Sequence, residues 1–439
     1  MQDLWKWPEI CDAVQAMDAD GPSVAALGFD SRKIEEGQLF IALRSNDHEA
    51  LTGDGHDFVE AAAKAGAVGA IVDHSFHKEC SIPTIRVPDT YKALHDLASR
   101  ARDRIQGAVV AVTGSSGKTT FKEFLTAILG GYRSAASFNN DIGVPISLVN
   151  ADLSKKAFVF EVGTNHPGEI GPLTSLINPE FSVLLNVQDA HIGNFRGSTE
   201  LLDEKRQIFT TIQNNQCRIS HDELGLEGYQ FGLREGSDAQ LISVNDNYCE
   251  INLFGRPVTA EMPVSGVHNA ITVAAALMTS ELLGKKVKDH VIIADSSHPR
   301  GRGNKSYVNG IEVIDDSYNA SPTSMMASLQ TQLDRGTSGK NVAVIGEMLE
   351  LGDESVQKHK KILQVLKNFD RVFLVGGVFS TLIAEHDQKS FSAYSKADKN
   401  LVRDIRIETN EGDTILVKGS NKIFWSHNFV AELCERLEV

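Results

Sequence analysis

The sequence predicts an α/β protein of three domains: a small N-terminal α/β domain, a central parallel sheet covered by helices on both faces, and a C-terminal Rossmann-like domain. Strand-like apolar runs alternate with helical stretches along the chain, an order typical of parallel sheets. The 439 residues exceed the roughly 250–300 at which a single core stops growing. A basic, Gly-rich stretch without periodicity, residues 298–306, interrupts the alternation and is the expected hinge.

The first domain is expected over residues 1–88. Residues 37–43 and 66–73 have the composition of buried strands, and residues 56–67 between them have helical spacing. The segment 82–90 contains two prolines and is interpreted as a linker.

The central domain, residues 89–299, opens with a helix over 91–105, whose small and leucine side chains fall on one face. Its expected strands are 108–112, 157–163 and 181–187, and a long apolar helix covers 268–284 and ends at a glycine. The C-terminal domain, residues 300–439, repeats the pattern with strands expected at 311–317, 341–347, 371–377 and 413–420.

Composition and charge narrow the classes of partner. A net charge of −15 argues against a general binder of nucleic acid or anionic membrane, although a local pocket for a small anion stays compatible with it. No apolar run approaches the roughly 18–20 residues of a membrane span. Five scattered cysteines without a CxxC pair indicate reduced thiols. With no recognisable signal peptide at the start, the sequence predicts a cytoplasmic protein without stable membrane association.

The stretch VVAVTGSSGKTTFKEFLTAIL, residues 109–129, carries the strongest functional signal. A strand runs into a Gly/Ser turn, and a helix follows, so backbone N–H groups from Gly114 to Lys118 can converge on a phosphate at the helix N-terminus. Lys118 can reach outer phosphates and Thr119 can hold Mg²⁺. An ordinary Gly-rich β-α turn is the simpler alternative, but the strand, turn, Lys-Thr pair and helix in register favour a P-loop-type nucleotide site.

Two further side chains follow strands of the same expected sheet. Glu161 ends the strand 157–163, where it is either a solvated strand-end residue or the carboxylate that holds Mg²⁺ beside the phosphate turn. His191 follows the strand 181–187, and both a metal or phosphate role and a purely structural role remain open.

Three other residues are weaker candidates. Lys205 by itself is predicted to be a solvated helix residue. Arg302 in the expected hinge can sense a phosphate charge and couple closure to binding. Asp316 ends a strand, where a carboxylate can accept a hydrogen bond from a ribose hydroxyl. Exposed-loop interpretations of Arg302 and Asp316 are equally compatible with the sequence.

A series of short segments, taken in their order along the chain from about residue 28 to 420, resembles the Mur ligases. These segments are DSR…GDGHDF, TGSSGKTT, NNDIGVP, EVGTNHPGEI, AHIGNF, GVHNA, GRG, DDSYNASP, GEMLELGDES and VKGS. DDSYNASPTSM and GEMLELGDES most resemble the members that add D-alanyl-D-alanine to a UDP-N-acetylmuramoyl-tripeptide, and no DNPR-type segment is present.

The resemblance implies an ATP-dependent peptide ligase of peptidoglycan precursor synthesis, a process that serves cell-wall growth, cell shape and cell division. ATP phosphorylates the terminal carboxylate of the UDP-sugar peptide. The amine of D-alanyl-D-alanine then attacks the acyl phosphate through a tetrahedral intermediate. The implied cofactors are ATP, two Mg²⁺ ions and CO₂ as a lysine carbamate. No nucleic acid is implied, and a monomer is expected.

The resemblance also assigns residues to roles. Lys118 is expected to contact the γ-phosphate, Thr119 and Glu161 to hold the first Mg²⁺, His191 to help hold the second, and Lys205 to be carbamylated as a metal ligand. Other ATP contacts are expected at Gly114, Ser115, Ser116, Gly117, Thr120, Asn269, Arg302 and Asp316. Expected substrate contacts are Ser31, Arg32, Asn139 and Asn165.

Some positions depart from the family pattern. Gln207 stands in place of a common Glu, Thr272 in place of a second Asn, and residues 420–428 lack the usual Arg and Met-Glu pair. These departures leave open a Mur-like ligase with another amine or acid. A catalytically silent nucleotide-binding relative is a second alternative, although Lys118, Glu161, His191 and Lys205 are all present. A P-loop GTPase is disfavoured, because SNKI lacks the Asp of an NKxD segment.

Overall fold

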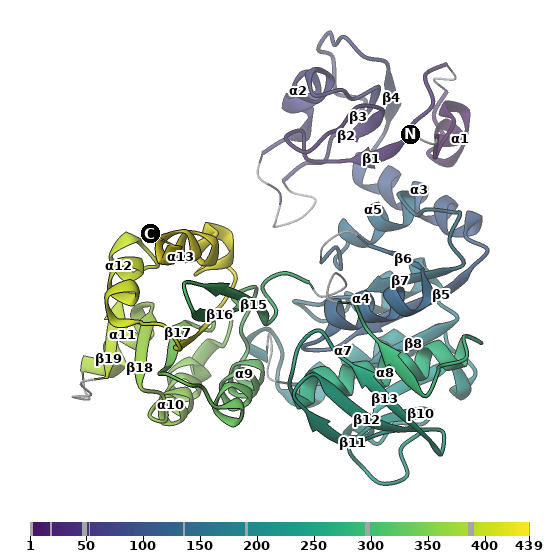
Figure 1. The fold of residues 1–439 in the computed structure, drawn as a ribbon. Coiled ribbons are helices and arrows are strands. Elements are labelled where there is room, and N and C mark those ends of the chain that lie inside the picture. The colour runs from purple at the N-terminus through teal and green to yellow at the C-terminus, as the bar shows by residue number, and fades with distance from the viewer. Residues whose placement is uncertain are drawn as a thin grey trace.

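The computed structural model describes residues 3–17, 20–45, 51, 53–134, 137–188, 192–294, 299–384 and 390–438. Three sheets of four, ten and six strands follow one another along the chain. Figure 1 shows them as three lobes, with the helix α9 on the side of the third lobe that faces the second. Among the described helices, none is long and apolar enough to cross a membrane.

The first sheet is parallel, in the order β1-β2-β3-β4. Its strands and the helices around it are α1 (Trp7–Ala13), β1 (Ala26–Gly28), β2 (Gln38–Ile41), η1 (Gly55–Phe58), α2 (Val59–Lys64), β3 (Gly69–Asp73) and β4 (Thr84–Val87). The interpretation of 82–90 as a linker is wrong, because β4 lies within it and pairs with β3. Pro83 and Pro88 flank this strand rather than interrupt it, and Ile85 and Val87 are buried.

The helix α3 (Thr90–Arg104) joins the first sheet to the second. It packs against α5 (Gly143–Val149) in a core that includes residues of both sheets. Hydrogen bonds reinforce this junction: the Trp5 indole donates to the Val149 carbonyl over 2.9 Å. The Asn150 amide bonds both backbone groups of Leu27, over 2.7 and 2.8 Å.

The second sheet runs in the order β14-β13-β12-β11-β10-β9-β8-β5-β7-β6. Its strands are β5 (Ala108–Thr113), β6 (Tyr132–Arg133), β7 (Ala157–Glu161), β8 (Phe181–Leu184), β9 (Arg218–His221), β10 (Tyr229–Gly232), β11 (Ala239–Asn245), β12 (Tyr248–Leu253), β13 (Arg256–Glu261) and β14 (His290–Ile292). The core around β5 is parallel, as predicted, whereas β11, β12 and β13 form an antiparallel meander that the pattern did not reveal.

Helices cover both faces of this sheet, as expected. Val110 and Val112 of β5 face a core that contains α4 (Lys118–Leu129) and α8 (Val267–Leu282). Val109 and Ala111 face the opposite core, which contains α3, α5 and α6 (Ile170–Ile177). The alternation arises because successive strand side chains point to opposite faces. The remaining helices of this region are η2 (Ile192–Asn194), α7 (Ser198–Arg206), η3 (Gln207–Phe209), η4 (Asn215–Cys217) and η5 (Asp222–Leu224).

The third sheet runs in the order β15-β16-β20-β17-β18-β19, parallel except for β15. Its strands are β15 (Asn304–Val308), β16 (Ile311–Asp316), β17 (Asn341–Gly346), β18 (Arg371–Val375), β19 (Phe391–Tyr394) and β20 (Thr414–Lys418). Its helices are α9 (Pro322–Arg335), η7 (Gly352–Glu354), α10 (Ser355–Leu366), α11 (Gly377–Ala384), α12 (Lys399–Glu408), η8 (Trp425–His427) and α13 (Phe429–Glu438). The expected hinge therefore ends earlier than predicted, because residues 304–306 belong to β15, and residue 298 lies outside the described residues.

Candidate active site

The phosphate turn lies between the end of β5 and the start of α4, as predicted. Gly117 is the residue before the helix and has a φ of 81°, a left-handed conformation that favours glycine. The Ser115 backbone N–H donates to the Asn186 carbonyl over 3.1 Å, which ties the turn to the end of β8. The Lys118 ammonium donates to the Gly114 carbonyl over 2.7 Å and therefore lies over the turn.

Lys205 lies inside the protein, so the expectation of a solvated residue is wrong. Only 2% of the surface of Lys205 is exposed to solvent. The neighbouring Glu204 carboxylate accepts backbone N–H bonds from Gly168 and Ile170, over 2.7 and 2.8 Å, and so holds α7 against the start of α6. The sequence pattern missed this because the packing partner is 34 residues away.

Two lysine ammonium groups near the phosphate turn have lowered pKa values: Lys205 is buried, whereas Lys118 is partly buried and lines the cavity. Burial, with a contribution from the nearby Lys118 charge, lowers the pKa of Lys205 to about 7. Burial lowers the pKa of Lys118 to about 8. The nearby Arg302 charge also lowers this pKa, whereas the Glu161 charge raises it. Both shifts arise because the charged form loses its hydration and faces another cation. A perturbed pair of this kind is typical of a functional site.

Glu161 lies beneath the turn, fully buried. One of its oxygens accepts from the Thr119 hydroxyl over 2.9 Å, and the other pairs with the Lys122 ammonium over 2.9 Å. Lys122 is itself 0% exposed and also donates to the Ser134 carbonyl over 2.9 Å. Sequence analysis missed Lys122, although it follows Lys118 by four residues, a spacing that places both on one side of a helix.

These oxygen donors fit Mg²⁺. The Thr119 hydroxyl and the Glu161 carboxylate lie side by side at the foot of the turn, and hydroxyl and carboxylate oxygens are ligands that Mg²⁺ accepts beside phosphates. The predicted ligand His191 lies outside the described residues. Elsewhere in the described part of the chain, no cluster of three or more His, Cys, Asp or Glu side chains could hold a metal ion.

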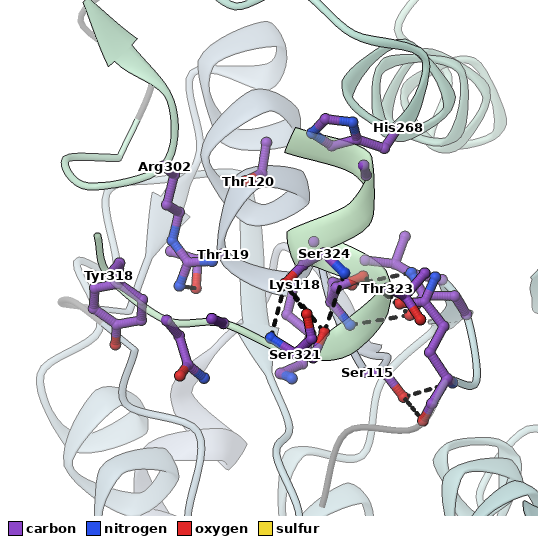
Figure 2. A pocket seen from close by; sticks show the side chains of 18 of the residues that line it. Ser115, Lys118, Thr119, Thr120, His268, Arg302, Tyr318, Ser321, Thr323 and Ser324 are labelled. Atoms are coloured by element: carbon purple, nitrogen blue, oxygen red, sulfur yellow. Dashed lines mark hydrogen bonds between the residues drawn. The ribbon is translucent and has the colours of Figure 1, made fainter. Parts of the chain in front are cut away.

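The turn opens into a cavity of about 540 Å³ between the second and third sheets. Most predicted ATP-site residues line it together: Ser115, Ser116, Gly117, Lys118, Thr119, Thr120, Asn269, Arg302 and Asp316. Asn139 and Asn165, predicted to bind substrate, line it as well. Figure 2 shows the turn residues opposite the start of α9, where Ser321, Thr323 and Ser324 lie. Gly114, Glu161 and Lys205 are not among the lining residues. Gly114 and Glu161 instead hydrogen-bond the lining residues Lys118 and Thr119.

Amide, hydroxyl and aromatic side chains line the α8 end of the cavity. The Asn269 side-chain amide donates to the Ser265 carbonyl over 2.9 Å, which orients the side chain. Thr272 also lines this part, and its hydroxyl donates to the His268 carbonyl. His221 and Phe231, which sequence analysis did not single out, line the same cavity in an edge-to-face contact.

The third sheet contributes a charged wall. The buried Lys418 ammonium donates to Asp316 over 2.8 Å and to the Asn319 carbonyl over 3.2 Å. The Ser328 hydroxyl also donates to the Asp316 carboxylate. Asp316 is thus held at the end of β16 by groups from β20 and α9. Lys418 was not predicted individually, although it belongs to the VKGS segment.

The loop after β17 forms another part of the cavity wall through Leu349, Glu350 and Leu351. Its position depends on His359, which is 0% exposed. The Met348 N–H donates to Nε2 of His359 over 3.0 Å, and Nδ1 of that ring bonds the Ser355 carbonyl over 2.7 Å. No local signal in the sequence distinguishes His359 from other helix residues.

Ser31 and Arg32 lie apart from this cavity, in the loop between β1 and β2. The Arg32 side chain is 85% exposed and pairs with Asp30 over 2.8 Å. The structure therefore does not bring these two predicted substrate residues to the phosphate turn.

Comparison with known proteins gives matches along most of the chain. The family model for the Mur ligase middle domain matches residues 112–280, and the model described as Mur ligase, glutamate ligase domain, matches residues 301–421. The chain is 30% identical over 413 residues to the UDP-N-acetylmuramoyl-tripeptide–D-alanyl-D-alanine ligase of Bacillus subtilis (strain 168), with 89% of each chain covered.

Solved structures are also similar to this chain over most of its length. A crystal structure of MurF from Acinetobacter baumannii is similar with a TM-score of 0.82 and 27% identity, covering 98% of this chain and 99% of that one. MurF ligase from Thermotoga maritima, solved in complex with ADP, is similar with a TM-score of 0.78 and 26% identity, covering 94% and 98%.

Proposed function

This chain belongs to the Mur ligase family, and we propose on that premise that it uses ATP to join D-alanyl-D-alanine to a UDP-N-acetylmuramoyl-tripeptide. One observation carries the proposal: the phosphate turn, whose Thr119 bonds the buried Glu161, shares a single cavity with Arg302 and Asp316 of the next lobe. That arrangement suits a reaction in which a nucleotide held by one sheet activates an acid for an amine held by the other.

The chemistry needs a site that stabilises anionic oxygens. A carboxylate is a poor electrophile, and phosphorylation supplies a leaving group. The backbone N–H groups of residues 114–118 and the Lys118 ammonium would stabilise charge on the transferred phosphoryl group. Magnesium, held by Thr119 and Glu161 with His191 assigned to a second ion, would supply further neutralisation of the phosphate charge.

We propose that Lys205 becomes a carbamate. Its neutral amine attacks the carbon of CO₂, and a nitrogen–carbon bond forms while one C=O π pair moves onto oxygen. The nitrogen then loses one proton to solvent, which leaves an anionic carbamate. A pKa of about 7 supports this, because a large neutral fraction is then present at neutral pH. The anionic product would also replace an ammonium beside the Lys118 charge, and it would offer oxygen donors to a metal ion.

Asp316, at the end of β16, is assigned to the ribose, and Arg302, just before β15, to the outer phosphates. Asn269 on α8 is assigned to the adenine. Ser31 and Arg32 are assigned to the UDP-sugar, and Asn139 and Asn165 to the reacting end of the peptide. The distance of the first lobe from the cavity suits a long substrate that reaches from one to the other.

We propose domain limits of 1–88, 89–299 and 300–439, because each range contains one of the three sheets. We also propose that the protein is a monomer. The described cysteines are all free thiols, which supports work in the reducing cytoplasm.

The decisive experiment measures phosphate release by the purified protein with ATP, Mg²⁺ and UDP-N-acetylmuramoyl-tripeptide, with and without D-alanyl-D-alanine. Release that requires both substrates, with a ligated product by mass, is the expected result. Release that ignores D-alanyl-D-alanine would point to another amine. No release with ATP still bound would identify a silent relative.

A further inference from the structure

A chain of hydroxyl groups links the third lobe to the proposed metal site. The Tyr318 hydroxyl donates to the Ser137 hydroxyl over 2.8 Å, and the Ser137 and Thr119 hydroxyl oxygens are 3.2 Å apart. Thr119 in turn donates to the Glu161 carboxylate over 2.9 Å. An ionised carboxylate can only accept, so the Thr119 proton is committed to Glu161 and Ser137 must be the donor to Thr119.

Arg302 completes the arrangement. Its Nη2 donates to the Thr119 hydroxyl oxygen over 3.1 Å, and its guanidinium carbon lies 4.2 Å from the centre of the Tyr318 ring. Figure 2 shows Arg302 pointing toward Thr119 with Tyr318 beside it. A hydroxyl oxygen has two lone pairs, and those of Thr119 accept from Ser137 and Arg302.

In this arrangement, other groups already use the Thr119 lone pairs that a metal ion would need. Glu161 is 0% exposed and Thr119 is 6% exposed. A metal ion that binds Thr119 needs one of the lone pairs now used by Arg302 or Ser137. Its charge also repels a guanidinium at the same position.

We propose that Tyr318 and Ser137 are positioning residues, which hold the cationic Arg302 on the metal site until Mg²⁺ replaces it. The inference rests on the proposed function, because it takes Thr119 and Glu161 as the metal site. Bound Mg²⁺ would take the Thr119 lone pair that Arg302 uses, and the guanidinium would then be available to a phosphate oxygen. The Tyr318 N–H donates to the Gly301 carbonyl over 2.9 Å, which ties Tyr318 to the segment that carries Arg302.

The test is a calorimetric titration of ADP into the full chain at a series of Mg²⁺ concentrations. Ser137→Ala and Tyr318→Phe each remove one link of the hydroxyl chain while leaving Thr119, Glu161 and Arg302 in place. Each is expected to lower the Mg²⁺ concentration for half-maximal ADP binding by about 2- to 10-fold, the effect of one lost hydrogen bond. The double variant should gain no more than either alone, because both substitutions break the same chain.

Tyr307→Phe is the matched control. Tyr307 lies on β15, and its hydroxyl donates to Glu312 of β16 over 2.8 Å, away from the metal site. The substitution should leave the Mg²⁺ requirement unchanged. Unchanged Mg²⁺ dependence in folded Ser137→Ala and Tyr318→Phe would overturn this inference and leave the proposed function intact. If wild-type protein bound ADP equally well without Mg²⁺, the metal site itself would be wrong. Thermal denaturation verifies that each variant is folded. If Ser137→Ala does not fold, the Mg²⁺ dependence of Tyr318→Phe alone tests the inference.

Discussion

Lys122 and Glu161 form an ion pair of 2.9 Å in which neither residue is exposed to solvent. The pair joins the first turns of α4 to the end of β7, directly below the phosphate turn. Burying two charges is costly, and their mutual attraction with the added bonds to Ser134 and Thr119 offsets that cost only while both partners are present.

Lys122→Met should therefore destabilise the protein by about 3–5 kcal/mol, because Glu161 would remain as an uncompensated buried charge. Urea unfolding monitored by circular dichroism measures this. The double variant Lys122→Met with Glu161→Leu should recover most of the loss. A double variant as unstable as the single one would show that packing, rather than the lost charge, accounts for the effect.

Lys118→Ala should abolish turnover, because the outer phosphates lose the cation that lies over the turn. Phosphate release with all substrates present measures it. Lys155→Ala, which removes an exposed lysine in the loop before β7, is the control and should retain wild-type activity. Near-normal activity of a folded Lys118→Ala protein would refute the phosphate assignment.

Lys205→Ala should be inactive and partly rescued by a short carboxylic acid that replaces the carbamate oxygens. Because the pKa of Lys205 is about 7, its amine is mostly charged below that pH and mostly neutral above it. Carbamylation should therefore increase from pH 6 to pH 8. Carbon-13 NMR with labelled CO₂ should show a carbamate signal at pH 8 in the wild-type protein and none in Lys205→Ala. A fully active Lys205→Ala protein would contradict the carbamate assignment.

His359 should make stability depend on pH. Burial lowers its pKa below the usual value, so the folded state takes up a proton less readily than the unfolded state. The folded protein should accordingly lose stability as the pH falls below about 6.5, the unfolded value. His359→Gln keeps an acceptor for the Met348 N–H without titrating. Its unfolding free energy should fall less than that of wild type between pH 7.5 and 5.5, and equal losses would contradict the assignment.

Asp316→Asn should weaken ADP binding by about tenfold or more, if the carboxylate accepts from a ribose hydroxyl. The sharper measurement compares ADP with 2′,3′-dideoxy-ADP in a binding titration. Wild type should discriminate between the two ligands, and the variant should not. Equal discrimination by both proteins would place Asp316 away from the ribose and leave it with its role of pairing Lys418.

The phosphate turn could be predicted because its contacts are local. Gly117, Lys118 and Thr119 are adjacent, and a strand-turn-helix order dictates where their groups point. The ends of β7 and β16 were predictable for the same reason. Glu161 and Asp316 each follow an apolar run, and parallel pairing places the ends of such strands at one edge of the sheet. The linker prediction for 82–90 is wrong because the two prolines lie outside β4, and the alternating side chains of Ile85 and Val87 are buried between them.

By itself the sequence determined the alternation of strands and helices around β5 and in the third lobe, the Gly/Ser turn before α4 and the likeness to a ligase family, since these depend on neighbouring residues. Tertiary structure alone decided which distant groups share an environment. Lys205 is buried because α7 is held against α6, Lys122 meets Glu161 across two elements, and Arg302 reaches Thr119 from another lobe. Burial and charge pairing between segments set these relationships, and neither is encoded in the spacing of residues along one segment.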